Sequence, residues 1–166
     1  TAAIVKKFPA VKLIHEPKQG YVYALRRGAK EASGEILVFT DADTIVPPDW
    51  LSRYQKAYQN QKVVCASGGV NLQPKFGLIS LIEFFLNLFG LVTKIGSGFN
   101  FSLLRSVYHK IGGANSQINF HAETDLILRA KKEGKAVFLL KNRVATSSRH
   151  YHGLKGSTIY SRGPLT

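Results

Sequence analysis

The stretch Glu35-Ile-Leu-Val-Phe-Thr-Asp-Ala-Asp-Thr44 decides the fold. Residues 36–40 are almost wholly apolar and rich in strand-forming side chains, which predicts a strand buried on both faces. Asp41 and Asp43 follow at once, and open α/β sheets bind their ligands beyond the carboxyl ends of the strands. Two neighbouring carboxylates repel each other unless a cation lies beside them, and their oxygens suit Mg²⁺ or Mn²⁺. The alternative is an ordinary polar turn, because Asp is common in turns.

The composition is that of a single globular domain with a large positive charge. The chain has 166 residues, of which 45% are hydrophobic, so we expect one domain over 1–166 with a real core. The net charge of +13 indicates an anionic partner such as nucleic acid, lipid headgroups or phosphorylated small molecules. Two acidic clusters, Asp41 with Asp43 and Glu123 with Asp125, favour a metal-dependent site acting on phosphates. No nucleic-acid partner is predicted, because the basic residues form no known reader motif.

The cysteine content and the N-terminus bear on the compartment. The single Cys65 lies in an apolar run, which predicts a buried, inert thiol, and one cysteine allows no internal disulfide. The N-terminus shows no signal-peptide pattern, and we expect the chain to be part of a longer protein because it begins at Thr1 and contains no methionine. The predicted location is cytoplasmic, with peripheral contact at the inner face of the membrane.

Periodicity and breaking residues predict alternating strands and helices along the chain. Strands are expected at 11–15, 36–40, 63–67, 136–140 and about 144–147, and helices at the first eight residues, 20–33, from Pro47 through Tyr58, 76–95, 104–111 and 123–133. The first strand, helix and strand in this order predict a parallel crossover. Lys18-Gln-Gly20 is either an ordinary turn or a helix N-terminus that faces a phosphate.

The segment 76–95 is the most apolar part of the chain. Its small and polar residues recur at intervals of three and four: Ser80, Glu83, Asn87, Gly90 and Lys94. This spacing predicts a helix with one narrow polar stripe. A membrane span is the alternative at this length, but Glu83 near its middle would cost about 2.5–3.5 kcal/mol, and a span would separate the two acidic clusters. We predict a helix that packs on the domain, as core alone or also in contact with a bilayer surface.

Five motifs occur in order along the chain. They are Gly20-x-x-x-Ala24-x-x-x-Gly28 with Ala32-x-Gly34, Phe39-Thr-Asp41-Ala-Asp43, Pro48-Asp-Trp50-Leu51, Gly98-x-Asn100 with Arg105 and Ile111-Gly-Gly113, and Glu123-Thr-Asp125-Leu-x-Leu-Arg129 before Gly134. In this order they resemble the family 2 glycosyltransferases of the GT-A fold over nearly the whole chain. The resemblance implies an α/β domain with a Rossmann-like, mixed and mostly parallel sheet flanked by helices. It also implies that the family's first strand, helix and strand, which bind much of the nucleotide, are missing.

The resemblance implies transfer of a sugar from a nucleotide-sugar donor to an acceptor hydroxyl with inversion, in polysaccharide, glycolipid or polyprenyl-phosphate-sugar synthesis. Gly20, Ala24, Asp41 and Asp43 are the implied donor-binding residues. Asp43, with Asp41 close by, is implied to hold Mg²⁺ or Mn²⁺ against the diphosphate leaving group, and His152 is a further implied metal ligand.

The acceptor is implied to be a sugar or a lipid-linked sugar. The implied acceptor-side residues are Trp50, Asn100, Glu123, Asp125 and Arg129. Glu123 is the implied catalytic base, which takes the acceptor proton. From the residues themselves we expect Asp125 to orient the start of its helix and Arg129, four residues on, to pair with it.

The chain departs from the family pattern in one motif. The family usually has Glu-Asp where this chain has Ala122-Glu123, so the reach of the base differs. Two rival interpretations stay open at this point. One is a catalytically inactive GT-A scaffold, suggested by Ala122 and the missing first elements. The other is a basic nucleic-acid-binding domain, suggested by charge alone.

Overall fold

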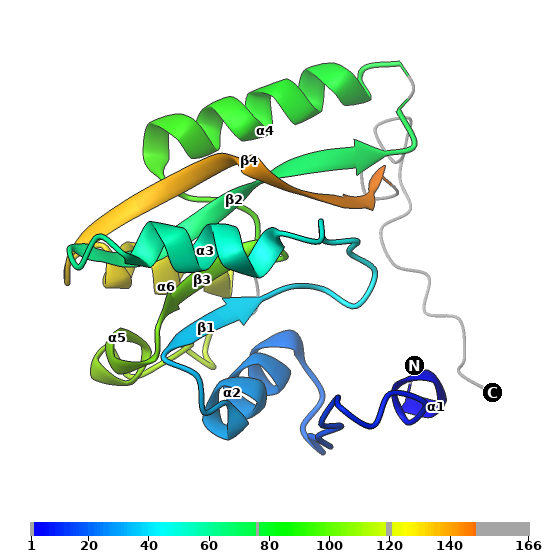
Figure 1. Cartoon of the computed structure of the whole chain (residues 1–166), viewed down its shortest axis with the longest axis vertical. Coiled ribbons are helices and arrows are strands. Elements are labelled where there is room, and N and C mark those ends of the chain that lie inside the picture. Colours follow the sequence, from blue (N-terminus) through cyan, green and yellow to red (C-terminus); the bar gives the residue numbers. More distant parts are fainter. Residues whose placement is uncertain (1, 76, 119–120, 149–166) are drawn as a thin grey trace.

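The structure, a computed structural model, describes residues 2–75, 77–118 and 121–148 (Figure 1). The elements follow in the order α1 (Ala2–Val5), α2 (Tyr21–Glu31), β1 (Ile36–Phe39), α3 (Trp50–Tyr58), β2 (Val63–Gln73), α4 (Ile79–Thr93), β3 (Phe101–Leu104), α5 (Arg105–Lys110), α6 (Ala122–Ala130) and β4 (Lys135–Ser147). The predicted helices are all present, although most are shorter than expected.

Four strands form one mixed sheet in the order β1-β3-β2-β4. β3 is antiparallel to both of its neighbours, whereas β4 is parallel to β2. Three strands therefore run in the same direction, which confirms the predicted mixed, mostly parallel sheet flanked by helices. Phe39 of β1 pairs with Phe101 of β3. This register places the glycine loop 96–100, which precedes Phe101, at the edge of the sheet where β1 ends.

The predicted strand at 11–15 is wrong, and so is the crossover that would start there. These residues pair with no other strand of the described ranges, and Val11 and Leu13 are exposed. Alternating apolar residues need a neighbouring strand and a covered face to form a ladder, and this segment has neither within the described part of the chain. The strand 36–40 is also less buried than predicted, because β1 is an edge strand of the described sheet and only Leu37 is fully buried.

The later strands differ in length from the prediction. β2 does not end before Gly68 and Gly69 but continues to Gln73, and β4 is one strand where two were predicted. A register shift between Gly68 and Val70 keeps the two strands paired across the irregularity. The sequence does not predict β3, because four residues between a glycine loop and a helix are too few to show a period.

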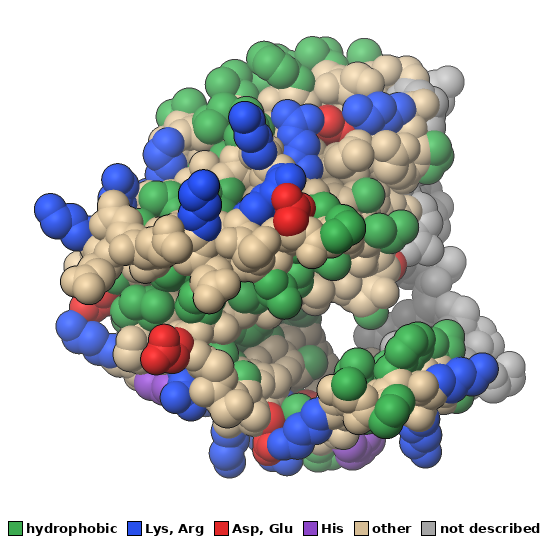
Figure 2. Space-filling model, in the orientation of Figure 1, with side chains coloured by type: hydrophobic (Ala, Val, Ile, Leu, Met, Phe, Trp, Pro, Cys, Tyr) green, Lys and Arg blue, Asp and Glu red, His purple; other side chains and the backbone are tan. Residues whose placement is uncertain are grey.

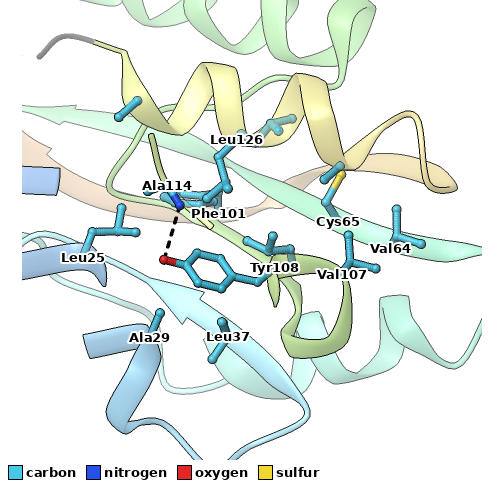
Figure 3. Packing of buried hydrophobic residues seen from close by; sticks show 14 of the residues in the cluster. Leu25, Ala29, Leu37, Val64, Cys65, Phe101, Val107, Tyr108, Ala114 and Leu126 are labelled. Carbon is cyan, nitrogen blue, oxygen red and sulfur yellow. Dashed lines mark hydrogen bonds between the residues drawn. The ribbon is translucent and has the colours of Figure 1, made fainter. Parts of the chain in front are cut away.

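The core covers both faces of the sheet. α2, α5 and α6 cover one face, where Phe101 and Leu126 lie in the largest hydrophobic cluster (Figure 3). α3 and α4 cover the other face with Tyr54 and Ile79. Cys65 is buried in the large cluster, as predicted, and burial raises the pKa of its thiol to about 11. The thiol therefore stays protonated at neutral pH.

α4 packs along β2 and β4, as the polar stripe predicts (Figure 1). It has 15 residues. Among the described residues, no helix combines the length and hydropathy needed to cross a bilayer.

Candidate active site

Asp41 and Asp43, the first acidic pair, lie in a turn directly after β1. Within the turn, Thr44 N donates a hydrogen bond of 3.3 Å to Asp41 O. Beyond it, Ile45 pairs with Ala145 of β4 through two backbone hydrogen bonds of 2.8 and 2.9 Å. The turn is therefore anchored by β1 before it and by β4 after it. This places both carboxylates at the carboxyl edge of the sheet, where the strand pattern predicts them.

Tyr21 connects the first acidic pair to Glu123. Tyr21 is the first residue of α2, and its pKa is raised by burial, then by the charge of Glu123, then by that of Asp41. Both carboxylates therefore lie near the same hydroxyl. Gly98 completes the junction, because a Cβ there would lie 3.0 Å from the Glu123 carboxyl carbon and 3.3 Å from the Tyr21 hydroxyl oxygen. A glycine lets these segments approach this closely.

A cavity of about 650 Å³, which we call the site cavity, runs between α2 and the end of β1. Its lining includes Tyr21, Ala24, Gly28, Thr40, Asp41, Leu51 and Gly98. Of the predicted donor-side residues, Ala24 and Asp41 line the site cavity. Gly20 directly precedes α2, and Asp43 is exposed in the turn after Asp41. Glu123 touches the rim of the cavity through its approach to Tyr21 and Gly98.

Glu123 and Asp125, the second acidic pair, lie in the first turn of α6 but have different surroundings. The Glu123 side chain is 15% exposed, and its carboxylate lies 3.7 Å from His121 Nδ1. Asp125 accepts hydrogen bonds of 2.9 and 2.6 Å from Arg129, which is the expected ion pair. Arg129 also donates to two backbone carbonyls of the turn 111–113, at 2.6 and 2.8 Å. Asp125 and Arg129 therefore tie α6 to this turn, while Glu123 approaches Gly98 at the rim of the site cavity.

Trp50 and Asn100, both predicted on the acceptor side, lie in the interior. Asn100 is 0% exposed, and its side-chain oxygen accepts hydrogen bonds from Trp50 Nε1 at 2.9 Å and the Tyr54 hydroxyl at 2.7 Å. Its amide nitrogen donates to the carbonyls of Gly69 and Asn142, both at 2.8 Å. All the hydrogen-bonding groups of the Asn100 amide are engaged inside the protein, so this side chain has a structural role, and its acceptor-side role stays a prediction. Asn100 joins β2, β4 and α3 beneath the glycine loop.

The predicted metal ligands are Asp41, Asp43 and His152, and the structure describes the first two. No group of three or more His, Cys, Asp and Glu side chains comes together within 2–75, 77–118 and 121–148, and His152 lies outside these ranges. The first acidic pair alone fits a divalent cation that arrives with phosphate oxygens and water, because Mg²⁺ is usually bound through one or two carboxylates plus substrate phosphates.

Sequence reasoning missed Tyr21 as a site residue. Its signal is modest: a side chain with a hydroxyl follows Gly20 at the start of the helix that precedes the acidic strand. The contact with Glu123 depends on packing between segments about a hundred residues apart, which no local pattern contains.

Comparison with known proteins identifies the fold and the family. Residues 1–112 match the family described as Glycosyl transferase family 2, so the match includes the first acidic pair and ends before the second. No curated protein matches the chain. A mannosyltransferase from Pyrobaculum calidifontis, solved in complex with GDP-Man and Mn²⁺, is 21% identical with a TM-score of 0.66, and the match covers 92% of this chain and 45% of that one.

A second solved structure is glucosyl-3-phosphoglycerate synthase from Mycobacterium tuberculosis, in complex with Mn²⁺, UDP-glucose and glycerol 3-phosphate. It is 17% identical with a TM-score of 0.48, and the match covers 84% of this chain and 48% of that one. The chain thus spans about half the length of these two proteins. The likeness to the mannosyltransferase shows the GT-A fold, and the match over well more than half of the sequence shows the family. The chain belongs to glycosyl transferase family 2.

Proposed function

We propose that the full-length protein is a metal-dependent, inverting glycosyltransferase that moves a sugar from a nucleotide-sugar to an acceptor hydroxyl. The observation that carries this proposal is the junction at Tyr21 and Gly98. There, Glu123 of one acidic pair lies beside the same hydroxyl and the same cavity as Asp41 of the other. Direct displacement at an anomeric carbon needs two groups on opposite sides of the sugar. One side stabilises the leaving diphosphate (the leaving-group side), and the other carries the base that deprotonates the acceptor (the base side).

The first acidic pair supports the leaving-group side. A Mg²⁺ or Mn²⁺ ion held by Asp43, with Asp41 close by, would supply positive charge against the negative charge that develops on the nucleoside diphosphate. The N-terminus of α2 opens at Gly20, beside the site cavity, and its backbone N–H groups favour a phosphate there. The anchored turn holds the two carboxylates in place before the donor binds.

Glu123 supports the base side. It lies in the first turn of α6, at the positive end of the helix dipole, where acidic side chains are commonly found. Its side chain is mostly shielded from solvent, so a hydroxyl that enters the cavity meets a carboxylate with little competing water. In the reaction, Glu123 accepts the proton of the acceptor hydroxyl as the oxygen attacks the anomeric carbon, and the bond to the diphosphate breaks on the opposite face.

We expect a hexose as the transferred sugar, and a sugar or lipid-linked acceptor as the substrate on the base side. Arg129 holds the turn 111–113, which lines a second cavity of about 430 Å³ together with Asp125 and Arg129. Because their charged groups are bonded to each other, the proposal gives both residues a positioning role.

The test is release of nucleoside diphosphate by the full-length protein from a panel of nucleotide-sugars, with Mn²⁺ or Mg²⁺ and with EDTA. Candidate acceptors are simple sugars and polyprenyl phosphates. Metal-dependent release that rises when an acceptor is added is the expected result. Binding of nucleoside diphosphate without turnover for any donor and acceptor would instead identify an inactive scaffold.

A further inference from the structure

The polarity of α4 is inverted relative to an ordinary surface helix. Its buried side carries Glu83 and Asn87, each 5% exposed, and the buried Gly90. Its outward side, which we call the apolar face, consists of Leu81, Phe84, Phe85, Leu88, Phe89 and Val92, exposed by 41–74%. Figure 2 shows hydrophobic side chains along the edge of the molecule where Figure 1 places α4. Contiguous apolar surface of this kind indicates a binding surface.

Hydrogen bonds to β2 fix this orientation of the helix. Glu83 accepts a hydrogen bond of 3.0 Å from Leu72 N, and Asn87 bonds both the N–H and the carbonyl of Val70, at 2.9 and 3.0 Å. A rotation that buried the phenylalanine side chains would leave these backbone groups and the Glu83 carboxylate without partners, which is strongly unfavourable for buried polar groups. The apolar face therefore cannot be covered by a simple rotation of α4.

Gly90 fixes the helix at its other end. A Cβ on Gly90 would lie 2.1 Å from the ring of Phe138 on β4, so a helix at this distance from the sheet requires glycine here. Within the described residues, close packing on the buried side therefore holds the apolar residues of the other side outward.

The charges around α4 are positive. Lys75 Nζ lies 3.3 Å and Arg143 Nη1 lies 3.5 Å from the Glu83 carboxylate, so the single acid of the helix is paired with two cations that are each 46% exposed. Lys94 follows the helix, and Lys131 Nζ donates to Thr93 O at its end. In Figure 2, Lys and Arg side chains border the hydrophobic edge. The helix thus presents an apolar strip with a cationic margin.

A second copy of the chain fits this surface poorly. A helix of 15 residues is roughly 22 Å long and 10 Å wide, so its outward face offers a few hundred Å², against about 800 Å² on each partner in a stable interface. Pairing two copies would also bring together two chains of +13 charge. An anionic bilayer has the opposite charge and accepts a narrow apolar strip lying in its plane.

We propose that α4 docks the protein on the surface of an anionic phospholipid bilayer, with its axis in the membrane plane and its apolar face in the headgroup boundary. This goes beyond the sugar-transfer function and does not depend on it. The helix lies on the membrane and does not cross it, because 15 residues are fewer than the roughly 20 that a span requires.

The test uses the position of one side chain, so that it reports on α4 itself. Cys65 is the only cysteine of residues 1–166 and is buried. With any cysteine outside these residues replaced by serine, the exchange Phe85→Cys in the full-length protein provides an exposed thiol for an environment-sensitive fluorophore. The matched control is Leu128→Cys, an exposed apolar position on α6, which packs on the other face of the sheet. Phosphatidylglycerol vesicles should shift the Phe85→Cys emission to the blue and leave the control unchanged. Phosphatidylcholine vesicles should have little effect at low salt.

A variant with Phe84→Ser, Phe85→Ser and Phe89→Ser tests the energetics. Each phenyl ring removed takes away a large part of the apolar area available for burial, so we expect vesicle affinity to fall roughly 100-fold or more. Circular dichroism confirms that the variant is folded. No blue shift at Phe85→Cys on anionic vesicles, or equal vesicle binding by the triple variant, would overturn the proposal. The proposal would also be overturned if sedimentation showed a concentration-dependent dimer whose interface is the apolar face of α4.

Discussion

In each of the two acidic pairs, one residue separates the two acids, but the first pair lies in a turn and the second on a helix. Asp41 and Asp43 lie in a turn that is anchored at both ends, and both carboxylates stay at one edge of the sheet. Glu123 and Asp125 lie on a helix, where two residues are separated by about 200° of rotation. The Glu123 side chain therefore approaches Gly98 at the rim of the site cavity, and the Asp125 side chain faces Arg129.

In the function we propose, this difference lets one repeated pattern supply two kinds of chemistry. A turn holds two carboxylates at one edge of the sheet, which suits shared binding of one cation. A helix separates them, so that the proposal gives proton transfer to Glu123 and a structural role to Asp125. The comparison can be tested by changing one member of each pair at a time.

The largest expected effect is on turnover. Glu123→Gln keeps the size of the side chain but removes its basicity, so kcat should fall about 10²–10⁴-fold with little change in donor affinity. Asp125→Asn is the matched control on the same helix turn and should lower kcat much less. Steady-state kinetics of both variants in the full-length protein measure this. If Asp125→Asn abolished turnover and Glu123→Gln were mild, the division of the second pair would be the reverse of the one we describe.

The next effect is on stability. Arg129→Met removes the bonds to Asp125 and to the turn 111–113 while keeping most of the aliphatic packing. Because the pair is partly exposed, we expect a loss of about 1–2 kcal/mol in the free energy of unfolding, measured by urea denaturation. Asp43→Asn should change the free energy of unfolding by less than Arg129→Met does, because Asp43 is exposed whereas Arg129 and Asp125 are partly buried. If Arg129→Met and Asp43→Asn lowered the free energy of unfolding equally, the structural role that we assign to the second pair alone would be contradicted.

The smallest effect is on the Tyr21 hydroxyl, which reports the distance between the pairs. Burial raises the pKa of Tyr21 most, and the charges of Glu123 and then Asp41 raise it further in metal-free protein. Glu123→Gln should therefore lower this pKa part of the way toward its ordinary value, and Asp41→Asn should lower it by less. Asp125→Asn should leave it unchanged. Titration of ring signals by NMR, assigned with Tyr21→Phe, gives the values. If Glu123→Gln left the pKa of Tyr21 unchanged, the two acidic pairs would not lie beside the same hydroxyl.

The sequence predicted the elements that have strong local patterns. The apolar run before Asp41, the polar stripe of α4 and the acidic start of α6 each carry their own period or cap, and all three elements are present. The turn after β1 follows from the apolar run and the two aspartates, whereas the mixed, mostly parallel sheet was implied by the family resemblance of the ordered motifs.

The sequence could not predict what depends on distant contacts. β3 is too short to have a period, and its pairing with β1 and β2 decides that the glycine loop reaches Glu123. Asn100 was predicted on the acceptor side because its motif resembles that of the family, yet its four hydrogen bonds bury it. The strand predicted at 11–15 failed for the opposite reason, because its apolar residues have no partner within the described chain.

The most direct test of the account is calorimetric titration of nucleoside diphosphate, starting with GDP and UDP, into the full-length protein with and without Mn²⁺. If the first acidic pair binds the cation and the second supplies the base, Asp43→Asn loses the Mn²⁺-dependent part of the affinity and Glu123→Gln keeps it. Unchanged Mn²⁺-dependent affinity in Asp43→Asn, or an equal loss in both variants, would contradict the separate roles of the two acidic pairs.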